Sequence, residues 1–412
     1  MKNLEIENLL KKYNQTNLIN MMNKFSEEEN KRIIEQLKNI DLERITELYN
    51  TTKKEIDVSP KNIEHINYID KSQLTDDEKN KYKTLGEEII KNKQYAVVTL
   101  AGGQGTRLGH NGPKGTFKIK VNGEEKYLFE IIVDSLKQAE KKYNVTIPWY
   151  IMVSSENENE TKKFLEEHNY FGYPKDKIFF FVQGNLPLVD VNGQLIINQN
   201  KLIKEASDGN GSIYNSMKKN KIIEDMKKSG IKWIFVGGVD NILLKIVDPI
   251  LTGATICQNN LIASKSVVKR EPSEKAGVFC KINGKPKVIE YTELSEEMAQ
   301  RTDEKGELIF GEINILSHLY SIRALEELAD VKLPYHIAFK KSNFLDINQD
   351  YIEVKEPNAY KFESFIFDAF ENYDNMSILR VKREEEFAPI KNATGKDSPE
   401  TAIKLYEQYS NR

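Results

Sequence analysis

The sequence predicts an α/β protein whose central sheet is mostly parallel and is flanked by helices. Short apolar runs with many β-branched and aromatic residues recur along the chain, as they do in strands that are buried on both faces. Stretches rich in lysine and glutamate, at helical period, separate these runs, which is the pattern of βαβ units. With 412 residues, 39% of them hydrophobic, the chain is long enough for a large core and for two or three domains.

The N-terminal part of the chain, residues 1–92, is predicted to be a helical region. It is rich in Lys, Glu, Asn, Leu and Ile and contains no strand-like apolar run. Ser26 with Glu29, and Thr75 with Glu78, have the spacing of capping boxes, which mark the first turns of helices. We therefore expect a domain boundary near residue 92.

Residues 93–412 are predicted to contain the sheet. The first apolar run, residues 95–100, ends in a glycine cluster, as a buried parallel strand does. Between residues 265 and 291 glycines divide the chain into short strands, which predicts a small antiparallel insertion beside the sheet. The other predicted strands and the clearest predicted helix lie at residues 149–153, 179–182 and 233–236, and at residues 128–142.

Composition and charge exclude several classes of protein. The 60 Lys and Arg residues nearly balance the 63 Asp and Glu residues, for a net charge of -3, so the totals provide no basic surface for nucleic acid. No run approaches the roughly 20 apolar residues of a membrane-spanning helix, and the N-terminus lacks the apolar core of a signal peptide. We therefore expect a cytoplasmic protein that binds neither membranes nor nucleic acids.

The cysteine content agrees with a reducing compartment. The two cysteines, Cys257 and Cys280, are too few for a structural zinc site or a disulfide framework. We expect both to be buried thiols that act as small apolar side chains.

A glycine-rich loop follows the first predicted core strand. Residues 100–109 read LAGGQGTRLG, and Pro113-Lys114-Gly115 follows shortly afterwards. Closely spaced glycines let backbone N–H groups approach a polyphosphate, while Arg107 and Lys114 supply cationic donors. The spacing fits neither the phosphate loop of ATPases nor the fingerprint of dinucleotide-binding dehydrogenases. The loop therefore predicts a nucleotide site of another type.

This string resembles the signature of the UDP-sugar pyrophosphorylases, which are nucleotidyltransferases of glycosyltransferase-A-like (Rossmann-like) fold. Further motifs continue the resemblance in the same order almost to the C-terminus. The resemblance implies that residues 93–412 form the catalytic domain and that its first loop binds the nucleotide. It implies catalytic roles for Arg107 and Lys114, and nucleotide contacts for Leu100, Ala101, Gly102 and Gly103.

The nucleotide side of the site is implied by three further segments. Gln183, in FVQGNLP, resembles the family's uracil-binding glutamine, whose amide has both a donor and an acceptor. In the turn DGNG, the resemblance places Gly209 against the base and Asn210 on the sugar. Asp240 follows an apolar strand at the edge where open α/β sheets bind ligands. We expect it to contact the nucleotide and to hold Mg2+ or Mn2+.

The sugar side is implied by two segments that resemble the family's sugar-binding hairpin and the strand beside it. In the hairpin, Gly277 and Glu290 are expected to meet hydroxyls of the hexose. Asn314, in the segment FGEINI, is expected to contact the sugar or its N-acetyl group. The neighbouring residues 311–313 depart from the family's usual motif.

The C-terminal part, residues 346–412, is expected to close the active site. Phe365 and Phe367 lie in a segment that resembles the aromatic segment of the N-acetylglucosamine branch, and core packing is the alternative for both. Lys391, in EFAPIKN, resembles the lysine that reaches the phosphates, and an exposed surface lysine is the alternative.

The resemblance implies one reaction, in which a sugar 1-phosphate attacks the α-phosphorus of UTP in line and pyrophosphate leaves. Arg107 and Lys114 would hold the departing pyrophosphate, and Lys391 would neutralise the attacking phosphate or the α-phosphate. The expected substrates are UTP and N-acetylglucosamine 1-phosphate, and the expected products are UDP-N-acetylglucosamine and pyrophosphate.

Two alternatives and the oligomeric state stay open at this stage. A broad UDP-sugar or UDP-glucose pyrophosphorylase would share the same core, and a non-catalytic UDP-sugar sensor would keep the fold for binding. The chain ends soon after Lys391, whereas longer family members carry a further small β domain. We therefore expect that domain to be absent and the protein to be a monomer.

Overall fold

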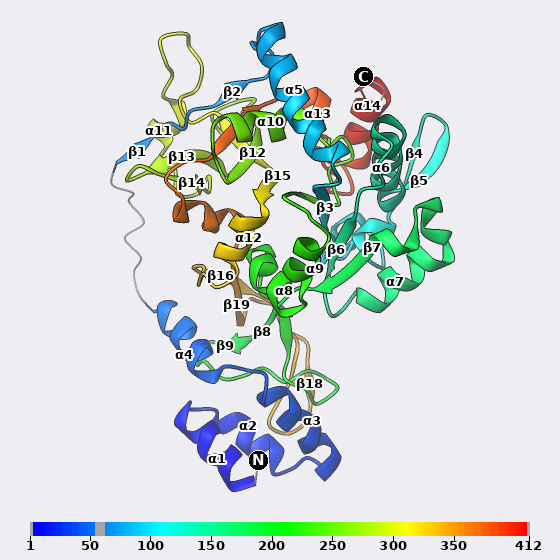
Figure 1. The fold of residues 1–412 in the computed structure, drawn as a ribbon. Coiled ribbons are helices and arrows are strands. Elements are labelled where there is room, and N and C mark those ends of the chain that lie inside the picture. Colours follow the sequence, from blue (N-terminus) through cyan, green and yellow to red (C-terminus); the bar gives the residue numbers. More distant parts are fainter. Residues whose placement is uncertain (1–2, 54–61, 410–412) are drawn as a thin grey trace. The chain divides into compact units, whose positions relative to one another are not determined.

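The computed structural model describes residues 3–53 and 62–409, and contacts within the chain divide it into two compact units (Figure 1). Each unit is assembled from segments that are distant in sequence. The small unit consists of Met1–Asp57, Gly184–Ser212 and Lys332–Ile366. The large unit consists of Val58–Gln183, Ile213–Val331 and Phe367–Arg412.

In its described residues, the small unit combines four helices with short antiparallel strands. Its helices are α1 (Asn3–Lys12), α2 (Thr16–Met22), α3 (Glu27–Leu37) and α4 (Leu42–Thr51). Its strands are β8 (Asn185–Pro187), β9 (Val189–Asp190), β10 (Glu205–Ser207), β16 (His336–Lys340), β17 (Phe344–Leu345), β18 (Tyr351–Ile352) and β19 (Ala359–Glu363). Helix α3 begins with the predicted capping box of Ser26 and Glu29, which is confirmed. Buried apolar residues such as Ile33 of α3 form one core with Ile203 and Phe362.

The central sheet of the large unit is mostly parallel. Its strands follow the order β2 (Ile69–Asp70), β20 (Ser377–Arg380), β12 (Ile262–Val268), β15 (Glu312–Ser321), β11 (Trp233–Gly238), β3 (Tyr95–Leu100), β6 (Trp149–Val153) and β7 (Ile178–Val182). Only β15 runs antiparallel to its neighbours along this path. The hairpin of β13 (Val278–Ile282) and β14 (Lys285–Ile289) joins beside it, and β1 (Ile63–Glu64) pairs with β13. The predicted fold class is confirmed, including the small antiparallel insertion.

Helices of the large unit flank this sheet. They are α5 (Asp76–Lys91), α6 (Leu128–Tyr143), α7 (Glu158–Glu167), α8 (Ile213–Lys219), α9 (Ile222–Lys228), α10 (Pro249–Cys257), α11 (Glu296–Gln300), α12 (Ile322–Leu328), α13 (Arg383–Glu386) and α14 (Pro399–Tyr409). A hairpin of β4 (Lys118–Val121) and β5 (Glu124–Tyr127) precedes α6. Over residues 3–53 and 62–409, no helix is long and apolar enough to cross a bilayer.

The division into units differs from the domain boundary predicted near residue 92. Helix α5 belongs to the large unit because it packs closely on α10 (Figure 1). Two glycines allow this approach: a Cβ at Gly86 would lie 2.0 Å from the carbonyl oxygen of Pro249, and one at Gly253 would lie 1.8 Å from that of Tyr82. The predicted helical region also contains the short strands β1 and β2.

The two cysteines lie in different surroundings. Cys280 is buried in β13, and burial raises the pKa of its thiol to about 12. Cys257 ends α10 and is exposed. The expectation that both thiols are buried is therefore wrong for Cys257, because the buried residues of this helix end at Thr255 and its last residue is exposed.

Candidate active site

The predicted site residues of the large unit gather at one edge of the central sheet. In the register of β11 with β3, Gly238 is opposite Leu100, and Leu100 is in turn opposite Met152 of β6. These parallel strands therefore end together, and the loops that follow them start at the same edge. Strand β15 enters at this edge, since its Ser317 is opposite Gly237. Open α/β sheets bind their ligands at such an edge.

The glycine-rich loop is folded by its own backbone hydrogen bonds. The N–H of Gly105 donates to the carbonyl of Gly112 at 2.9 Å, and that of Lys114 donates to Gly103 at 3.0 Å. Gly109 has a φ of 69°, which favours glycine. A Cβ at Gly103 would meet no atom within 4 Å, so neither the backbone nor packing requires glycine there. An open backbone of this kind is what a phosphate needs for close approach.

Asn157 holds the start of this loop, and the sequence analysis missed it. Its side chain is fully buried. Nδ2 donates to the carbonyl of Ala101 at 2.9 Å, and Oδ1 accepts from the N–H of Ser154 at 2.9 Å. Asn157 lies in a stretch of Glu and Asn residues that otherwise reads as a polar helix start, so no local signal distinguishes it.

Gln183 lies against the glycine-rich loop. It follows β7, and its N–H donates to the carbonyl of Val153 at 2.9 Å. A Cβ at Gly102 would lie 2.8 Å from the amide atoms of the Gln183 side chain. Within the part of the chain that the structure describes, no residue forms a hydrogen bond with this amide. The amide is therefore beside the predicted phosphate loop and has its donor and acceptor available.

Lys114, Asp240 and Lys391, which we call the phosphate cluster, come together after β3, β11 and β20. Nζ of Lys114 lies 3.0 Å from Oδ2 of Asp240. Burial by itself would raise the pKa of Asp240, but the charges of Lys114 and Lys391 lower it below its ordinary value. Arg107, on the same loop as Lys114, is exposed and forms no ion pair with any described residue. The cluster thus combines an ionised carboxylate with the half-buried Lys114 and the exposed Lys391.

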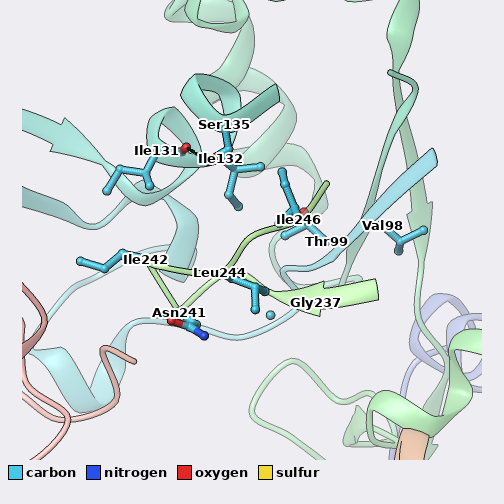
Figure 2. A pocket seen from close by; sticks show the side chains of 11 residues that line it. Val98, Thr99, Ile131, Ile132, Ser135, Gly237, Asn241, Ile242, Leu244 and Ile246 are labelled. Carbon is cyan, nitrogen blue, oxygen red and sulfur yellow. Dashed lines mark hydrogen bonds between the residues drawn. The ribbon is translucent and has the colours of Figure 1, made fainter. Parts of the chain in front are cut away.

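Apolar packing lies behind the segment that carries Asp240. Figure 2 shows a cavity whose lining includes Val98 and Thr99 of β3, Ile131 of α6, and Asn241 and Leu244 after β11. Its volume is about 10 Å³, which is room for one water at most. This cavity is therefore too small to hold a substrate.

The residues present fit a divalent metal that completes its ligands from a substrate. Asp240 supplies one ionised carboxylate. Residues 3–53 and 62–409 contain no group of three His, Cys, Asp or Glu side chains that could hold a metal. Mg2+ keeps several waters and uses one or two carboxylates together with substrate phosphates. The single carboxylate of Asp240 is the kind of donor that Mg2+ or Mn2+ would share with the phosphates of a nucleotide.

Gly277, Glu290 and Asn314, which we call the sugar cluster, are also neighbours. Gly277 precedes β13, Glu290 follows β14, and Asn314 lies in β15. The N–H of Asn314 donates to the carbonyl of Gly277 at 2.9 Å. A Cβ at Gly277 would lie 3.2 Å from Oε1 of Glu290. The hairpin and the strand therefore bring the three predicted sugar contacts to one place.

The unusual Glu312 next to this cluster has a structural partner. Its buried carboxylate accepts from Nε of Arg380 at 2.8 Å and from the hydroxyl of Ser266. The departure from the family motif at this position therefore accompanies an ion pair between β15 and β20. Asn314 keeps its place two residues further along the strand.

The remaining predicted residues lie in the small unit or are buried. Gly209 has a φ of 92°, and a Cβ there would lie 2.1 Å from the carbonyl oxygen of Ser364. Oδ1 of Asn210 accepts from the N–H of Ile366 at 2.9 Å, while the ring of Phe365 packs on another ring of the small unit. Phe367 is 8% exposed, as core packing would leave it. The predicted roles of these residues toward a ligand stay predictions.

Comparisons with known proteins find relatives over most of the chain. The family described as UTP--glucose-1-phosphate uridylyltransferase matches residues 42–397. The chain is 40% identical to UDP-N-acetylglucosamine pyrophosphorylase of Saccharomyces cerevisiae over 339 residues, which cover 79% of this chain and 71% of that protein. It is 34% identical to UDP-N-acetylglucosamine diphosphorylase 2 of Arabidopsis thaliana, over 95% of this chain and 81% of that protein.

A solved structure extends the comparison to three dimensions. The crystal structure of uridine diphosphate N-acetylglucosamine pyrophosphorylase from Trypanosoma brucei, in complex with an inhibitor, matches with a TM-score of 0.79 at 28% identity. The match covers 96% of this chain and 82% of that chain. The similarity therefore extends over both compact units.

Proposed function

The chain belongs to the UDP-sugar pyrophosphorylase family, and we propose that it is a UTP:N-acetylglucosamine-1-phosphate uridylyltransferase. The products of the proposed reaction are UDP-N-acetylglucosamine and pyrophosphate. The observation that carries the proposal is the phosphate cluster beside an open glycine-rich loop, in a chain whose relatives are named for N-acetylglucosamine.

The chemistry is a nucleotidyl transfer without a covalent enzyme intermediate. An oxygen of the sugar 1-phosphate forms a bond to the α-phosphorus of UTP, and the bond from that phosphorus to the β-phosphate's bridging oxygen breaks. Catalysis of such a step consists mainly of positioning and charge neutralisation. Arg107 and Lys114 hold the departing pyrophosphate. Lys391 neutralises the phosphate oxygens at the attacking side.

Asp240 would hold the metal. Mg2+ or Mn2+, when bound, supplies further positive charge to the phosphate oxygens. The ion pair with Lys114 supports this role, because it keeps the carboxylate ionised and oriented in the protein itself. Gln183 recognises the base with its available amide, and the adjacent Gly102 leaves the room that this amide occupies.

The sugar preference rests on the sugar cluster and on the relatives. Glu290 accepts hydrogen bonds from hydroxyls of the hexose, and Asn314 reads the N-acetyl group from the neighbouring strand. The second candidate is a UDP-glucose or broad UDP-sugar pyrophosphorylase. It is favoured by the family description, which names glucose 1-phosphate. A non-catalytic sensor is less well supported, because Arg107, Lys114, Asp240 and Lys391 are all present.

Pyrophosphate release tests the proposal. The purified protein is incubated with UTP and Mg2+, in separate reactions with N-acetylglucosamine, N-acetylgalactosamine, glucose and galactose 1-phosphates. We expect a preference for the N-acetylated sugars. Equal use of glucose 1-phosphate would favour the broad enzyme. No release with any sugar, together with UTP binding in calorimetry, would favour the sensor.

The same proposal includes a monomeric protein that acts in the cytoplasm and binds no nucleic acid. The balanced charge supports the absence of nucleic-acid binding, and the low cysteine content supports a reducing compartment. Sedimentation at several protein concentrations tests the oligomeric state.

A further inference from the structure

The two segments that carry Asp240 and Lys391 are joined by a short backbone ladder in the large unit. The N–H of Ile390 donates to the carbonyl of Asp240 at 2.9 Å, and that of Ile242 donates to Ala388 at 3.3 Å. Between these bonds, Asn241 and Pro389 form an antiparallel bridge. The ladder therefore sets the register between the metal-site carboxylate and the lysine of the phosphate cluster.

Both polar atoms of the Asn241 side chain form hydrogen bonds with the backbone of the segment that carries Lys391. Nδ2 donates to the carbonyl of Glu386 at 2.9 Å, and Oδ1 accepts from the N–H of Ala388 at 2.9 Å. Oδ1 also accepts from Leu243 at 3.3 Å within its own segment. The residue is 8% exposed, so water cannot easily replace these bonds. Among the standard side chains only asparagine offers this donor and acceptor at this length.

Both segments also end at one buried group of charges, which we call the buried ion cluster: Lys71, Asp248, Lys265 and Glu386. Asp248 follows Asp240 in one segment, and Glu386 precedes Lys391 in the other. Nζ of Lys265 lies 2.8 Å from Oδ2 of Asp248 and also pairs with Glu386. Nζ of Lys71 lies 2.9 Å from Oε1 of Glu386. The side chains of Lys265, Glu386 and Asp248 are 0%, 1% and 4% exposed.

The buried ion cluster contains two lysines and two carboxylates, so its positive and negative charges are equal in number, and they are joined by ion pairs. Burial by itself would raise the pKa of Glu386, but Lys265 and Lys71 lower it below its ordinary value. Asp248 also caps α10 by accepting from the N–H groups of Ile250 and Leu251. Such a cluster fixes the ends of the two segments, because moving either end would leave a buried charge without its partner.

We propose that Asn241 is a positioning residue, which sets the placement of Lys391 relative to Asp240 while the buried ion cluster anchors both segments. The inference rests on the proposed function, since it acts through two residues of the phosphate cluster. A small misplacement of a catalytic group lowers turnover strongly, because the phosphate contacts must be formed in the transition state.

A double-mutant cycle with Lys391 tests the catalytic part. We expect Asn241→Ala to lower kcat about 10–100-fold and to change KM for UTP little. In the Lys391→Ala background the same substitution should lower kcat no further, because the group that it positions is gone. If the two losses in kcat multiply, the proposal is overturned.

Asn358→Ala is the matched control. Asn358 forms the same pair of bonds in the small unit: its Oδ1 accepts from the N–H of Ser342 at 2.8 Å, and its Nδ2 donates to Ser342 at 3.0 Å. Asn358→Ala should lower the free energy of unfolding by no more than Asn241→Ala does, because Asn358 is half-buried and water can replace part of its bonds, and its kcat should be unchanged. An equal loss of kcat in the control would show a general structural effect and would overturn the proposal.

Hydrogen exchange gives a readout that does not need activity. The amides of Ala388 and Ile390 are bonded to the Asp240 segment, so Asn241→Ala should speed exchange in residues 386–391, and Asn358→Ala should not. Unchanged exchange in Asn241→Ala would overturn the proposal. A wild-type protein that releases no pyrophosphate would contradict the proposed function instead, and the exchange result would still decide whether Asn241 holds this segment.

Discussion

The phosphate cluster and the buried ion cluster consist of the same chemical groups in opposite surroundings. Lys114, Asp240 and Lys391 lie at the open edge of the sheet, and Lys391 is exposed. In the buried ion cluster, Lys265 lies between two carboxylates and is fully buried. Both clusters draw on the same two segments of the chain, one after β11 and one after β20.

The difference indicates two roles: the charges of the phosphate cluster can bind substrate, and those of the buried ion cluster stabilise the fold. A lysine that binds phosphate in the transition state must remain accessible to the substrate. In the free protein such a lysine therefore pairs with only one carboxylate, which is partly exposed. A buried lysine needs carboxylate partners close to its ammonium group, since an isolated buried charge is very costly in free energy. Substitutions in the buried ion cluster should therefore change stability, and substitutions in the phosphate cluster should change turnover.

The largest expected effect is on stability. Lys265→Met leaves the carboxylates of Asp248 and Glu386 buried with one cation fewer, and should lower the free energy of unfolding by about 3–5 kcal/mol. Urea denaturation followed by circular dichroism measures it. Lys162→Met is the control, because Lys162 pairs with Glu158 on an exposed helix face and such pairs contribute about 0.3–0.5 kcal/mol. Equal losses in the two variants would refute the contrast between buried and exposed charges.

The next effect is on turnover. Lys114→Ala should lower kcat about 10²–10³-fold, since it removes a cation that stabilises charge on the leaving phosphates. Its free energy of unfolding should fall by less than that of Lys265→Met, because Lys114 pairs with a single, partly exposed carboxylate. Steady-state pyrophosphate release measures kcat. A variant with near-normal turnover would show that Lys114 does not act on the phosphates.

A smaller effect is expected on sugar selectivity. Asn314→Ala removes a single neutral contact to the sugar, so the preference for N-acetylglucosamine 1-phosphate over glucose 1-phosphate should fall about 10-fold. The ratio of kcat/KM for the two sugars measures this preference. A uniform fall for both sugars, with the ratio unchanged, would place Asn314 outside the selectivity of the sugar cluster.

The smallest effect concerns pH. The pKa of Glu386 is lowered in the folded protein from its ordinary value of 4.5. Its stabilising contribution is therefore present above that ordinary value and is lost as the pH falls through the lower, folded pKa. Between about pH 5 and pH 3, the wild type should lose stability more steeply than Glu386→Gln. Identical slopes in denaturation curves across this range would show that Glu386 is not stabilised as an anion.

The sequence predicts what local patterns determine. The run Tyr95–Leu100 coincides with β3, and both capping boxes start helices, because each depends on a few adjacent residues. The buried ion cluster was not predicted, since it joins Lys71 to Glu386 across 315 positions. The lysine within the buried strand segment IASKSVV is the one local sign of it.

Some features of the candidate site could likewise be predicted from the sequence, and others could not. The glycine-rich loop and Asp240 follow strands directly, and the resemblance places them without knowledge of their contacts. Asn157 holds that loop, and Asn241 is bonded to the segment that carries Lys391, yet each reads as an ordinary polar residue. Their roles depend on backbone groups that only the folded chain brings near.

Transfer of label from UTP tests the central claim most directly. UTP labelled at the α-phosphorus is incubated with N-acetylglucosamine 1-phosphate, Mg2+ and the wild-type or the Lys114→Ala protein. The account predicts that the wild type places the label in UDP-N-acetylglucosamine, leaves none on the protein, and forms product far faster than the variant. Label retained on the wild-type protein, or equal rates in the two proteins, would contradict direct transfer assisted by the phosphate cluster.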